Sequence, residues 1–448
     1  MTPSQAGLGR YELFSIGLLL NVLFLFSIAF ADQPKAAVSL NEINPPKAPK
    51  HTVVIRGANV IDGKGGADAS RTFRSHRVVV IQGAKIAVVG EMRELPANAE
   101  IVDATGMTLL PGFIDSHFHI ERDYEMPRLV LSHGVTSLRD PGQWIWVYDP
   151  IRNSPLLQPR CFVAGPHLDR PPPAHPADAF LVSNVVDVAT AVNRFIDEGA
   201  SVIKCYYRLP ADFIAAACTA AHKHGVPVTA HLELVDAREA ILAGLDGVEH
   251  VTSFGTALAE PKEAEAFRSA VNQDNEARRK ERYRLWSRLD FDRSSRMTPV
   301  IDLIVRKHVT LSPTLAVFER RPRDRGATEM EWRGFENMSK FIALCHRAGA
   351  KIVVGSHTEV PHAARGWAYH RELQLLQESG LSNSEIISAA TLENARYFRV
   401  EDRLGSIEPG KFADLLLVDG DPLKDIDALR NVRGVMLNGN WVIKPQAK

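Results

Sequence analysis

The sequence predicts an α/β protein in which a (β/α)8 TIM barrel is inserted into a small composite β-sandwich domain built from both chain ends. Between residues 112 and 392, short apolar runs alternate with longer stretches of helical periodicity, a pattern typical of βα units. Eight apolar runs occur there, which is the number of strands in such a barrel. β-rich runs broken by Gly and Asp flank this region on both sides, so we expect the chain to leave a small domain, build the barrel and return.

The N-terminal segment predicts export. Arg10 precedes an apolar run over residues 13–30 that ends in Ala29-Phe30-Ala31, a motif suited to signal cleavage. We therefore expect a signal peptide over residues 1–31 and a periplasmic or secreted protein. The run approaches the length of a membrane span, so an uncleaved anchor that tethers the protein to a membrane is the alternative. Residues 32–50 contain four prolines and predict a linker.

The two β-rich ends predict the composite domain over residues 51–110 and 396–448, which leaves 111–395 for the barrel. The β-rich runs lie at residues 52–56, 77–81, 85–89, 107–110, 413–418, 434–437 and 441–443.

The eight barrel strands are expected at residues 113–119, 135–139, 161–164, 202–206, 228–233, 248–251, 310–312 and 352–356. Helices intervene, such as residues 211–224 before Gly225 and the helix opened by the capping box Ser382-x-x-Glu385. The loop at 165–176 follows the third strand and is expected to shape the pocket. A highly charged stretch at 260–296 predicts either a solvated helical excursion or a lid over the barrel mouth.

Charge and cysteine content exclude some functions. Lys and Arg total 53, as do Asp and Glu, so the formal net charge is zero and nucleic acid is not expected as a partner. The four cysteines lie far apart without a C-x-x-C pair, which argues against a disulfide framework and a thiolate zinc site. A homo-oligomer is compatible with this composition.

Histidines at the predicted strand ends indicate a metal site. His117 and His119 lie at the end of the first predicted strand, and side chains at i and i+2 of an extended chain face the same way. That spacing is weak evidence alone, since His222-Lys-His224 repeats it at a helix end, where we interpret it as a chance pair. A single strand-end histidine is more often an ordinary hydrogen-bonded residue.

Three further residues favour a metal site over isolated hydrogen-bonded histidines. Lys204, His231 and His250 end the fourth, fifth and sixth predicted strands. Active sites of such barrels are built at the carboxyl ends of the strands, so these side chains are expected to converge with His117 and His119. For Lys204, a side chain that reaches from the strand end to solvent is the alternative.

Taken in order, the motifs resemble the metal-dependent amidohydrolase superfamily, most closely its imidazolonepropionase and Xaa-Pro dipeptidase-like branch. The resemblance is carried by Pro111-Gly-Phe-Ile-Asp-Ser-His-Phe-His119, Val-Ile-Lys204, His231, Glu-His250 and Gly405-Ser-Ile-Glu-Pro-Gly-Lys-Phe-Ala-Asp414. It implies two divalent metal ions, with zinc as the first choice. His117 and His119 would bind the more buried ion, and His231 and His250 the second. Lys204, carboxylated by CO2, would bridge both ions.

One position departs from the family pattern. The family's eighth strand normally ends in an Asp that binds metal and moves a proton, whereas this chain has His357. An imidazole can bind a metal and accept a proton, but it lacks the negative charge. Altered catalysis, a single-metal site and a non-catalytic barrel are therefore all open.

Neighbouring polar residues are further candidates. His357 is the candidate catalytic base, and Glu233 and Glu359 are candidate proton carriers, with solvated loop carboxylates as the alternative. Tyr206 and Arg208 are candidate substrate-binding residues, and an ordinary surface arginine is the alternative for Arg208.

The predicted function is that of an exported metal-dependent amidohydrolase. It would cleave a C–N bond of a small molecule or short peptide with a metal-activated water. A catalytically impaired or non-catalytic barrel that binds a metal or small molecule is the alternative, because of His357. A metal-dependent esterase or lactonase would use the same site.

Overall fold

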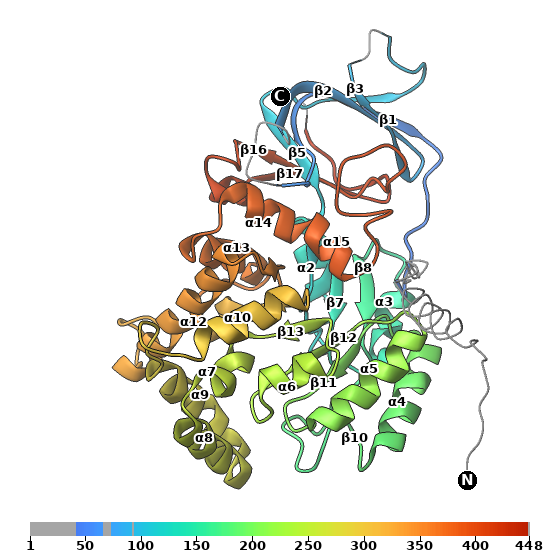
Figure 1. The fold of residues 1–448 in the computed structure, drawn as a ribbon. Helices are drawn as coiled ribbons and strands as arrows, with labels where there is room; N and C mark the ends of the chain where they lie inside the picture. Colours follow the sequence, from blue (N-terminus) through green and yellow to red (C-terminus); the bar gives the residue numbers. More distant parts are fainter. Residues whose placement is uncertain (1–41, 66–72, 92–93, 447–448) are drawn as a thin grey trace, which may run out of the picture. The chain divides into compact units, whose positions relative to one another are not determined.

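The computed structural model of the chain describes residues 42–65, 73–91 and 94–446, and these lie in one compact unit, Ser39–Lys448 (Figure 1). The predicted signal peptide or anchor, and the linker up to residue 41, lie outside the described residues. Within the described part, no helix combines the length and the apolar character needed to cross a bilayer.

The β-rich domain is built from both chain ends, as predicted. Strand β5 lies antiparallel to β16, with Leu110 opposite Leu416, so the segment before the barrel pairs directly with the segment after it. Strand β1 is shared, because β4 pairs with its first half and β5 with its second. The sheet follows the order β18-β17-β16-β5-β1-β2-β3. The bounds are β1 Thr52–Ile61, β2 Phe73–Gln82, β3 Lys85–Gly90, β4 Glu100–Asp103, β5 Met107–Pro111, β16 Leu415–Asp419, β17 Val432–Leu437 and β18 Asn440–Ile443.

The eight predicted barrel strands are all present among the described residues, each shorter than or close to the predicted run. They are β6 Phe113–Asp115, β7 Val135–Asp140, β8 Arg160–Val163, β11 Ile203–Cys205, β12 Val228–His231, β13 Gly247–Glu249, β14 Thr310–Ser312 and β15 Lys351–Ile352. Neighbours pair in parallel within β6–β7–β8 and from β11 to β15. Backbone hydrogen bonds join the two groups: the Ser201 N–H donates to the Val163 carbonyl of β8 over 2.8 Å, and the Ser116 N–H just after β6 donates to the Val354 carbonyl just after β15 over 2.9 Å. The α/β barrel with a β-rich domain from both ends is thus confirmed.

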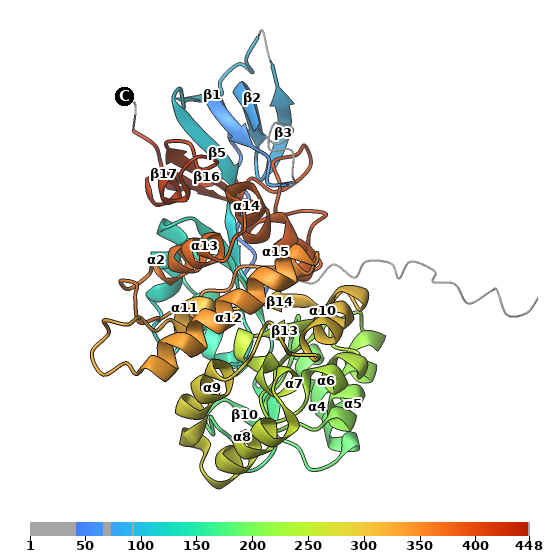
Figure 2. The ribbon, with the colours of Figure 1, turned by 60° about the vertical axis from the view of Figure 1, so that its left-hand side comes forward.

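Helices surround the barrel (Figures 1 and 2). Apolar residues of these helices and of the strands form one buried core cluster. The predicted helix at 211–224 is observed as α5 Ala211–Lys223, and the Ser382–Glu385 capping box opens α14. The other longer helices are α2 Met126–Ser132, α4 Val185–Asp197, α6 Ala237–Leu242, α8 Pro261–Gln273, α9 Arg278–Ser287, α10 Met297–Arg306, α12 Glu329–Arg347, α13 Ala368–Glu378, α14 Asn383–Ala390 and α15 Leu392–Tyr397. Short elements are η1 Ile145–Tyr148, α3 Asp149–Arg152, η2 Val251–Phe254, α7 Gly255–Leu258, η3 Asn275–Ala277, α11 Leu315–Phe318 and η4 Ile426–Arg430.

Two features were not predicted. Strands β9 His167–Asp169 and β10 Ala179–Leu181 extend the barrel sheet beside β11. Helix α15 spans the predicted boundary between residues 395 and 396 and sends Tyr397 into the barrel interior. Gly247 leaves room for that ring, since a Cβ there would lie 2.0 Å from the Tyr397 hydroxyl.

Candidate metal centre and substrate pocket

Histidines from the first, fifth, sixth and eighth barrel strands converge at the carboxyl ends of the strands. His117 and His119 approach each other to 3.1 Å between their Nε2 atoms. The ring of His250 lies 4.4 Å from that of His117 and 4.5 Å from that of His231. His357 joins them, since His117, His250 and His357 each offer a ring nitrogen within 4.8 Å of the others. Lys204 lines the same cavity, so the predicted ligand candidates meet in one place.

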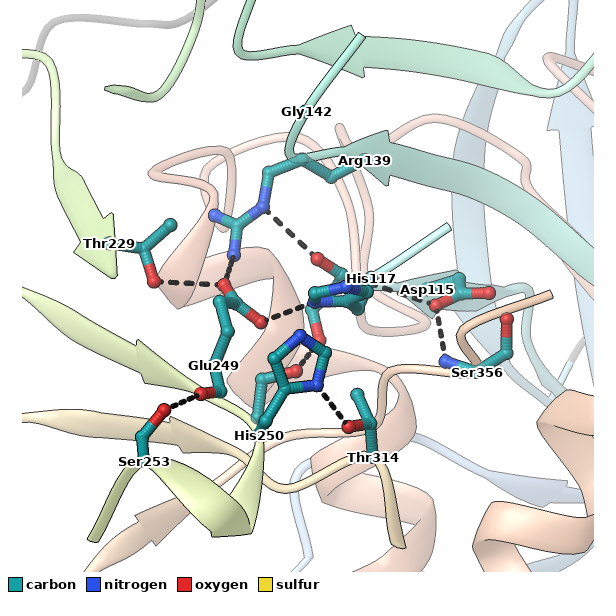
Figure 3. A network of polar contacts seen from close by, with 12 residues as sticks. Asp115, His117, Arg139, Gly142, Thr229, Glu249, His250, Ser253, Thr314 and Ser356 are labelled. Atoms are coloured by element: carbon teal, nitrogen blue, oxygen red, sulfur yellow. Dashed lines mark hydrogen bonds and ion pairs between the residues drawn. The ribbon is translucent and has the colours of Figure 1, made fainter. Parts of the chain in front are cut away.

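A carboxylate beneath the cluster orients His117. The Nδ1–H of His117 donates to Glu249 over 2.8 Å, which leaves Nε2 directed at the other histidines (Figure 3). Glu249 also accepts from Arg139 at 3.2 Å and from Thr229 at 2.9 Å (Figure 3). Such carboxylate–histidine pairs fix the tautomer and orientation of metal ligands. The sequence motifs predict no role for Glu249 or Arg139, although Glu249 directly precedes His250.

Backbone strain accompanies the other ligand candidates. His250 has φ 64° and His357 has φ 59°, and Thr314 and Thr358 beside them are also left-handed. Thr314 receives a 2.7 Å hydrogen bond from Nδ1 of His250, and Thr358 accepts one of the same length from the His119 backbone N–H. Non-glycine residues in this region cost free energy and cluster at functional sites.

Burial keeps most of the imidazoles neutral. It lowers the pKa of His117 and of His231 to about 3, and it holds the pKa of His250 and His357 well below the usual range. Burial opposes protonation of His119 as well, but the hydrogen bond and charge of Asp140 outweigh it and raise that pKa. Neutral imidazole is the form that binds metals.

Lys204 and His231 complete a donor set that fits metal ions. Burial lowers the pKa of Lys204 to about 8, although Glu249 opposes the shift, so neutral amine is accessible near neutral pH. That form of an amine reacts with CO2. Both ring nitrogens of His231 are buried without a hydrogen-bond partner in the described part of the chain. Buried polar atoms normally have partners, and a metal would satisfy His231.

The histidines lie in a cavity of about 470 Å³, the size of a small-molecule site. Tyr206 lines it, as predicted, and packs its ring 4.9 Å from that of His231. His167 and His175 from the loop at 165–176 also line the cavity, which agrees with the expected role of that loop.

The charged stretch at 260–296 contributes to the pocket, so a purely solvated excursion is wrong. Helix α9 buries Trp286 and Tyr283 against the barrel and turns Arg278 and Arg282 into the cavity. Arg278 as a whole residue is only 6% exposed.

Three predicted site residues lie elsewhere. Arg208 donates to Asn272 at 2.9 Å and to the Val271 carbonyl at 3.1 Å, so it holds the α8–η3 segment, and it is not among the described residues that line the cavity. Glu359 is exposed and is not among the described residues that line the cavity. Glu233 is buried between Arg278 and Arg282 behind the lining.

Glu233 is also a poor proton carrier. Burial favours its neutral form, but Arg282, His231 and Arg278 outweigh that effect and lower the pKa of Glu233 to about 2. A carboxylate with so low a pKa stays ionised at neutral pH and accepts a proton weakly. The second histidine pair agrees with its interpretation as chance, because His222 lies in the last turn of α5 and contacts Asp246 at 2.7 Å.

The fold and the strand-end histidines define a barrel protein of the kind that metal-dependent hydrolases use. A model of the Amidohydrolase family matches residues 129–442, and the chain belongs to that family. This confirms the resemblance inferred from the motifs.

Known relatives and structures agree with this assignment. A dihydroorotase from Anaeromyxobacter dehalogenans (strain 2CP-C) is 42% identical over 66 residues, 15% of this chain and 14% of the relative. An N-acyl-D-glutamate deacylase from Alcaligenes xylosoxydans xylosoxydans is 39% identical over 92 residues, 20% of this chain and 17% of the relative. The chain thus matches less than a fifth of the length of either relative.

Solved structures share the whole fold. A putative prolidase from Bifidobacterium longum has a TM-score of 0.69 at 24% identity, covering 90% of this chain and 97% of that one. A Xaa-Pro dipeptidase with bound methionine has a TM-score of 0.67 at 22% identity, covering 88% and 100%.

Proposed function

We propose that the protein is a metal-dependent hydrolase that cleaves a C–N bond of an amide or short peptide. The observation that carries the proposal is the convergence of neutral, buried imidazoles and Lys204 on one small-molecule cavity. The deacylase and dipeptidase names of the relatives and neighbours support an amide-type bond.

The ligand assignment is the one that the family resemblance implies, and the convergence of these side chains on one cavity supports it. His117 and His119 would hold one divalent ion, and His231 and His250 the second, with carboxylated Lys204 between them. Zinc is the first choice, because nitrogen and oxygen ligands of this kind suit it. Bound divalent ions would polarise the scissile carbonyl and lower the pKa of water so that hydroxide is available at neutral pH.

His357 would move the proton. Burial keeps its imidazole neutral, and its place in the cavity lining, which Glu233 lacks, would let it reach the attacking water. The same nitrogen would then give that proton to the leaving amine. The backbone N–H of His357, which donates to the His117 carbonyl over 2.7 Å, keeps this imidazole at the cluster.

Export and membrane attachment stay predictions from residues 1–31. We propose a periplasmic or secreted enzyme that acts on a small molecule or a short peptide. Size-exclusion chromatography of the mature protein would decide between a monomer and a homo-oligomer.

The proposal is tested with purified protein loaded with zinc and with the same protein after chelation. We expect the loaded enzyme to hydrolyse members of a panel of dipeptides and N-acyl amino acids, and the chelated enzyme to lose that activity. Hydrolysis of lactones or esters alone would favour the esterase alternative. Unchanged amide hydrolysis after complete metal removal would contradict the proposal.

A further inference from the structure

Part of the cavity wall is basic and comes from outside the barrel strands. Helix α9 contributes Arg278, Arg279 and Arg282, and the segment after α11 contributes Arg320. The carboxylates that line the cavity, Glu121, Asp140 and Asp178, lie after β6, at the end of β7 and before β10. Positive charge is therefore concentrated on the α9 part of the wall.

Two of these arginines share one buried carboxylate. The Nε atoms of Arg278 and Arg282 lie 3.7 and 3.5 Å from the two oxygens of Glu233. These distances exceed hydrogen-bonding range, and neither Glu233 oxygen has a hydrogen bond among the described residues. Two guanidiniums against one carboxylate leave an excess of positive charge beside the cavity.

Arg278 shows most directly that the positive charge beside the cavity lacks partners. Its side chain is 7% exposed, and its Nε is buried without a hydrogen-bond partner in the described part of the chain. Its Nη1 makes one long contact, 3.4 Å to the Tyr206 hydroxyl. A buried unsatisfied donor is costly, and an anion in the cavity would remove that cost.

Aromatic rings support the guanidiniums. Arg278 lies 4.9 Å from the ring centre of Tyr207, Arg282 lies 5.3 Å from that of Phe318, and Arg320 lies 5.3 Å from that of Tyr283. Stacking on aromatic faces orients a guanidinium without using its N–H groups. One N–H of Arg320 donates to the Glu319 carbonyl over 2.7 Å and the Nε–H of Arg282 to the Arg278 carbonyl over 3.1 Å, which leaves other N–H groups of each side chain for a ligand. The planar fork matches a carboxylate group with two parallel hydrogen bonds.

We propose that Arg278, Arg282 and Arg320 bind a free carboxylate of the substrate. This carboxylate site rests on the proposed function. It narrows the expected substrates to N-acyl amino acids and peptides with a free terminal carboxylate, in preference to neutral amides. The cavity of about 470 Å³ accommodates such a molecule between the histidines and the arginines.

The test measures binding, so that it does not depend on turnover. Isothermal titration calorimetry on metal-depleted protein would compare N-acetylglycine, N-acetyl-leucine and N-acetylproline with their carboxamides. We expect the acids to bind roughly ten- to a hundredfold more tightly, the usual effect of hydrogen bonds to a charged group.

Arg282→Gln should remove most of this preference. It leaves Arg278 and Glu233 as a one-to-one pair, so the variant should still fold, which its melting temperature checks. Glu233→Gln should act in the opposite direction and tighten binding of the acids. Arg284→Gln is the matched control, because Arg284 lies on the same helix, contacts Glu281 and is not among the described residues lining the cavity.

The outcomes separate the two proposals. Equal binding of acids and carboxamides, or no measurable binding of the acids, would overturn the carboxylate site whatever the enzyme hydrolyses. Loss of the preference in Arg284→Gln but not in Arg282→Gln would also overturn it. A clear preference for the acids, without hydrolysis of any compound in the panel, would support the site and contradict the proposed hydrolase.

Discussion

A single residue, Glu249, connects the candidate metal centre with the barrel interior. Burial opposes its ionisation, but Lys204, His117 and Arg139 hold the pKa of Glu249 below its usual range. The carboxylate therefore stays charged and accepts the Nδ1–H of His117. Arg139 in turn lies 4.0 Å from the ring centre of Tyr397, so the bottom of the barrel supports the ligand at its top.

Glu249→Gln should weaken metal binding roughly ten- to a hundredfold, the usual effect of losing such a support. Competition with a coloured chelator measures this affinity. Tyr397→Phe is the control, because it removes the hydroxyl contacts to Thr229 at 2.9 Å and to Glu249 at 3.2 Å and keeps the carboxylate. Equal loss of affinity in both variants would show that general loosening of the barrel, and not the Glu249 charge, is responsible.

His357→Ala should lower kcat at least about a hundredfold, the lower bound for loss of a general base. His357→Asp discriminates between an active and an impaired natural site. A site adapted to histidine should lose activity with aspartate, whereas an impaired site should gain it. Unchanged kcat in both variants would remove His357 from the reaction.

Among single residues, the sequence predicted the candidate metal ligands but not the charged residues that orient them. Strand-end histidines and Lys204 could be predicted because the barrel sends the carboxyl ends of its strands to one face. Arg139 and Glu249 could not, since charged side chains inside a barrel depend on partners from distant strands. Arg208 does not line the cavity, because its acceptors Asn275, Asn272 and the Val271 carbonyl all belong to the charged stretch at 260–296.

Among the helices and strands, α9 contributes most to the basic part of the pocket wall. Its sequence is dominated by charged residues and predicted a solvated helix, yet Trp286 is fully buried and lies 5.8 Å from Phe341 of α12. This packing holds the arginines at the pocket. The sequence of α9 has no clear apolar periodicity, so the burial of its aromatic side chains cannot be predicted from it.

Trp286→Ala should lower the free energy of unfolding by about 3–5 kcal/mol, because it leaves a large cavity under α9. Urea denaturation measures the change. Trp146→Ala is the control, since that side chain is 60% exposed and its loss should change stability by less than about 0.5 kcal/mol. Similar losses in the two variants would contradict the structural role of α9.

The whole molecule combines a barrel with a β-rich domain from both chain ends, and this was predictable because the two ends share one pattern. The pairing of β5 with β16 was not predictable, since register depends on contacts between residues hundreds of positions apart.

Buried neutral histidines make the stability of the whole molecule depend on pH. Burial lowers the pKa of His231 to about 3, so as pH falls below about 6.5 the unfolded chain takes up protons first.

Metal-free protein should therefore lose stability as pH falls from about 6.5 towards 3, by up to about 1.4 kcal/mol per pH unit for each such histidine. His231→Gln removes one of these groups, so its stability should fall less steeply over the same range. Denaturant unfolding at several pH values measures both slopes. Identical slopes would contradict the assignment of His231 as a buried neutral imidazole.

The central claim is that the strand-end histidines and Lys204 bind metal, and metal content per chain tests it most directly. Elemental analysis of purified protein should give about two transition-metal ions for the wild type. His231→Ala and Lys204→Ala should each hold fewer, while His222→Ala, which alters the other histidine pair, should hold as many as the wild type. A wild-type protein without bound transition metal, or equal metal content in His231→Ala and His222→Ala, would contradict the account.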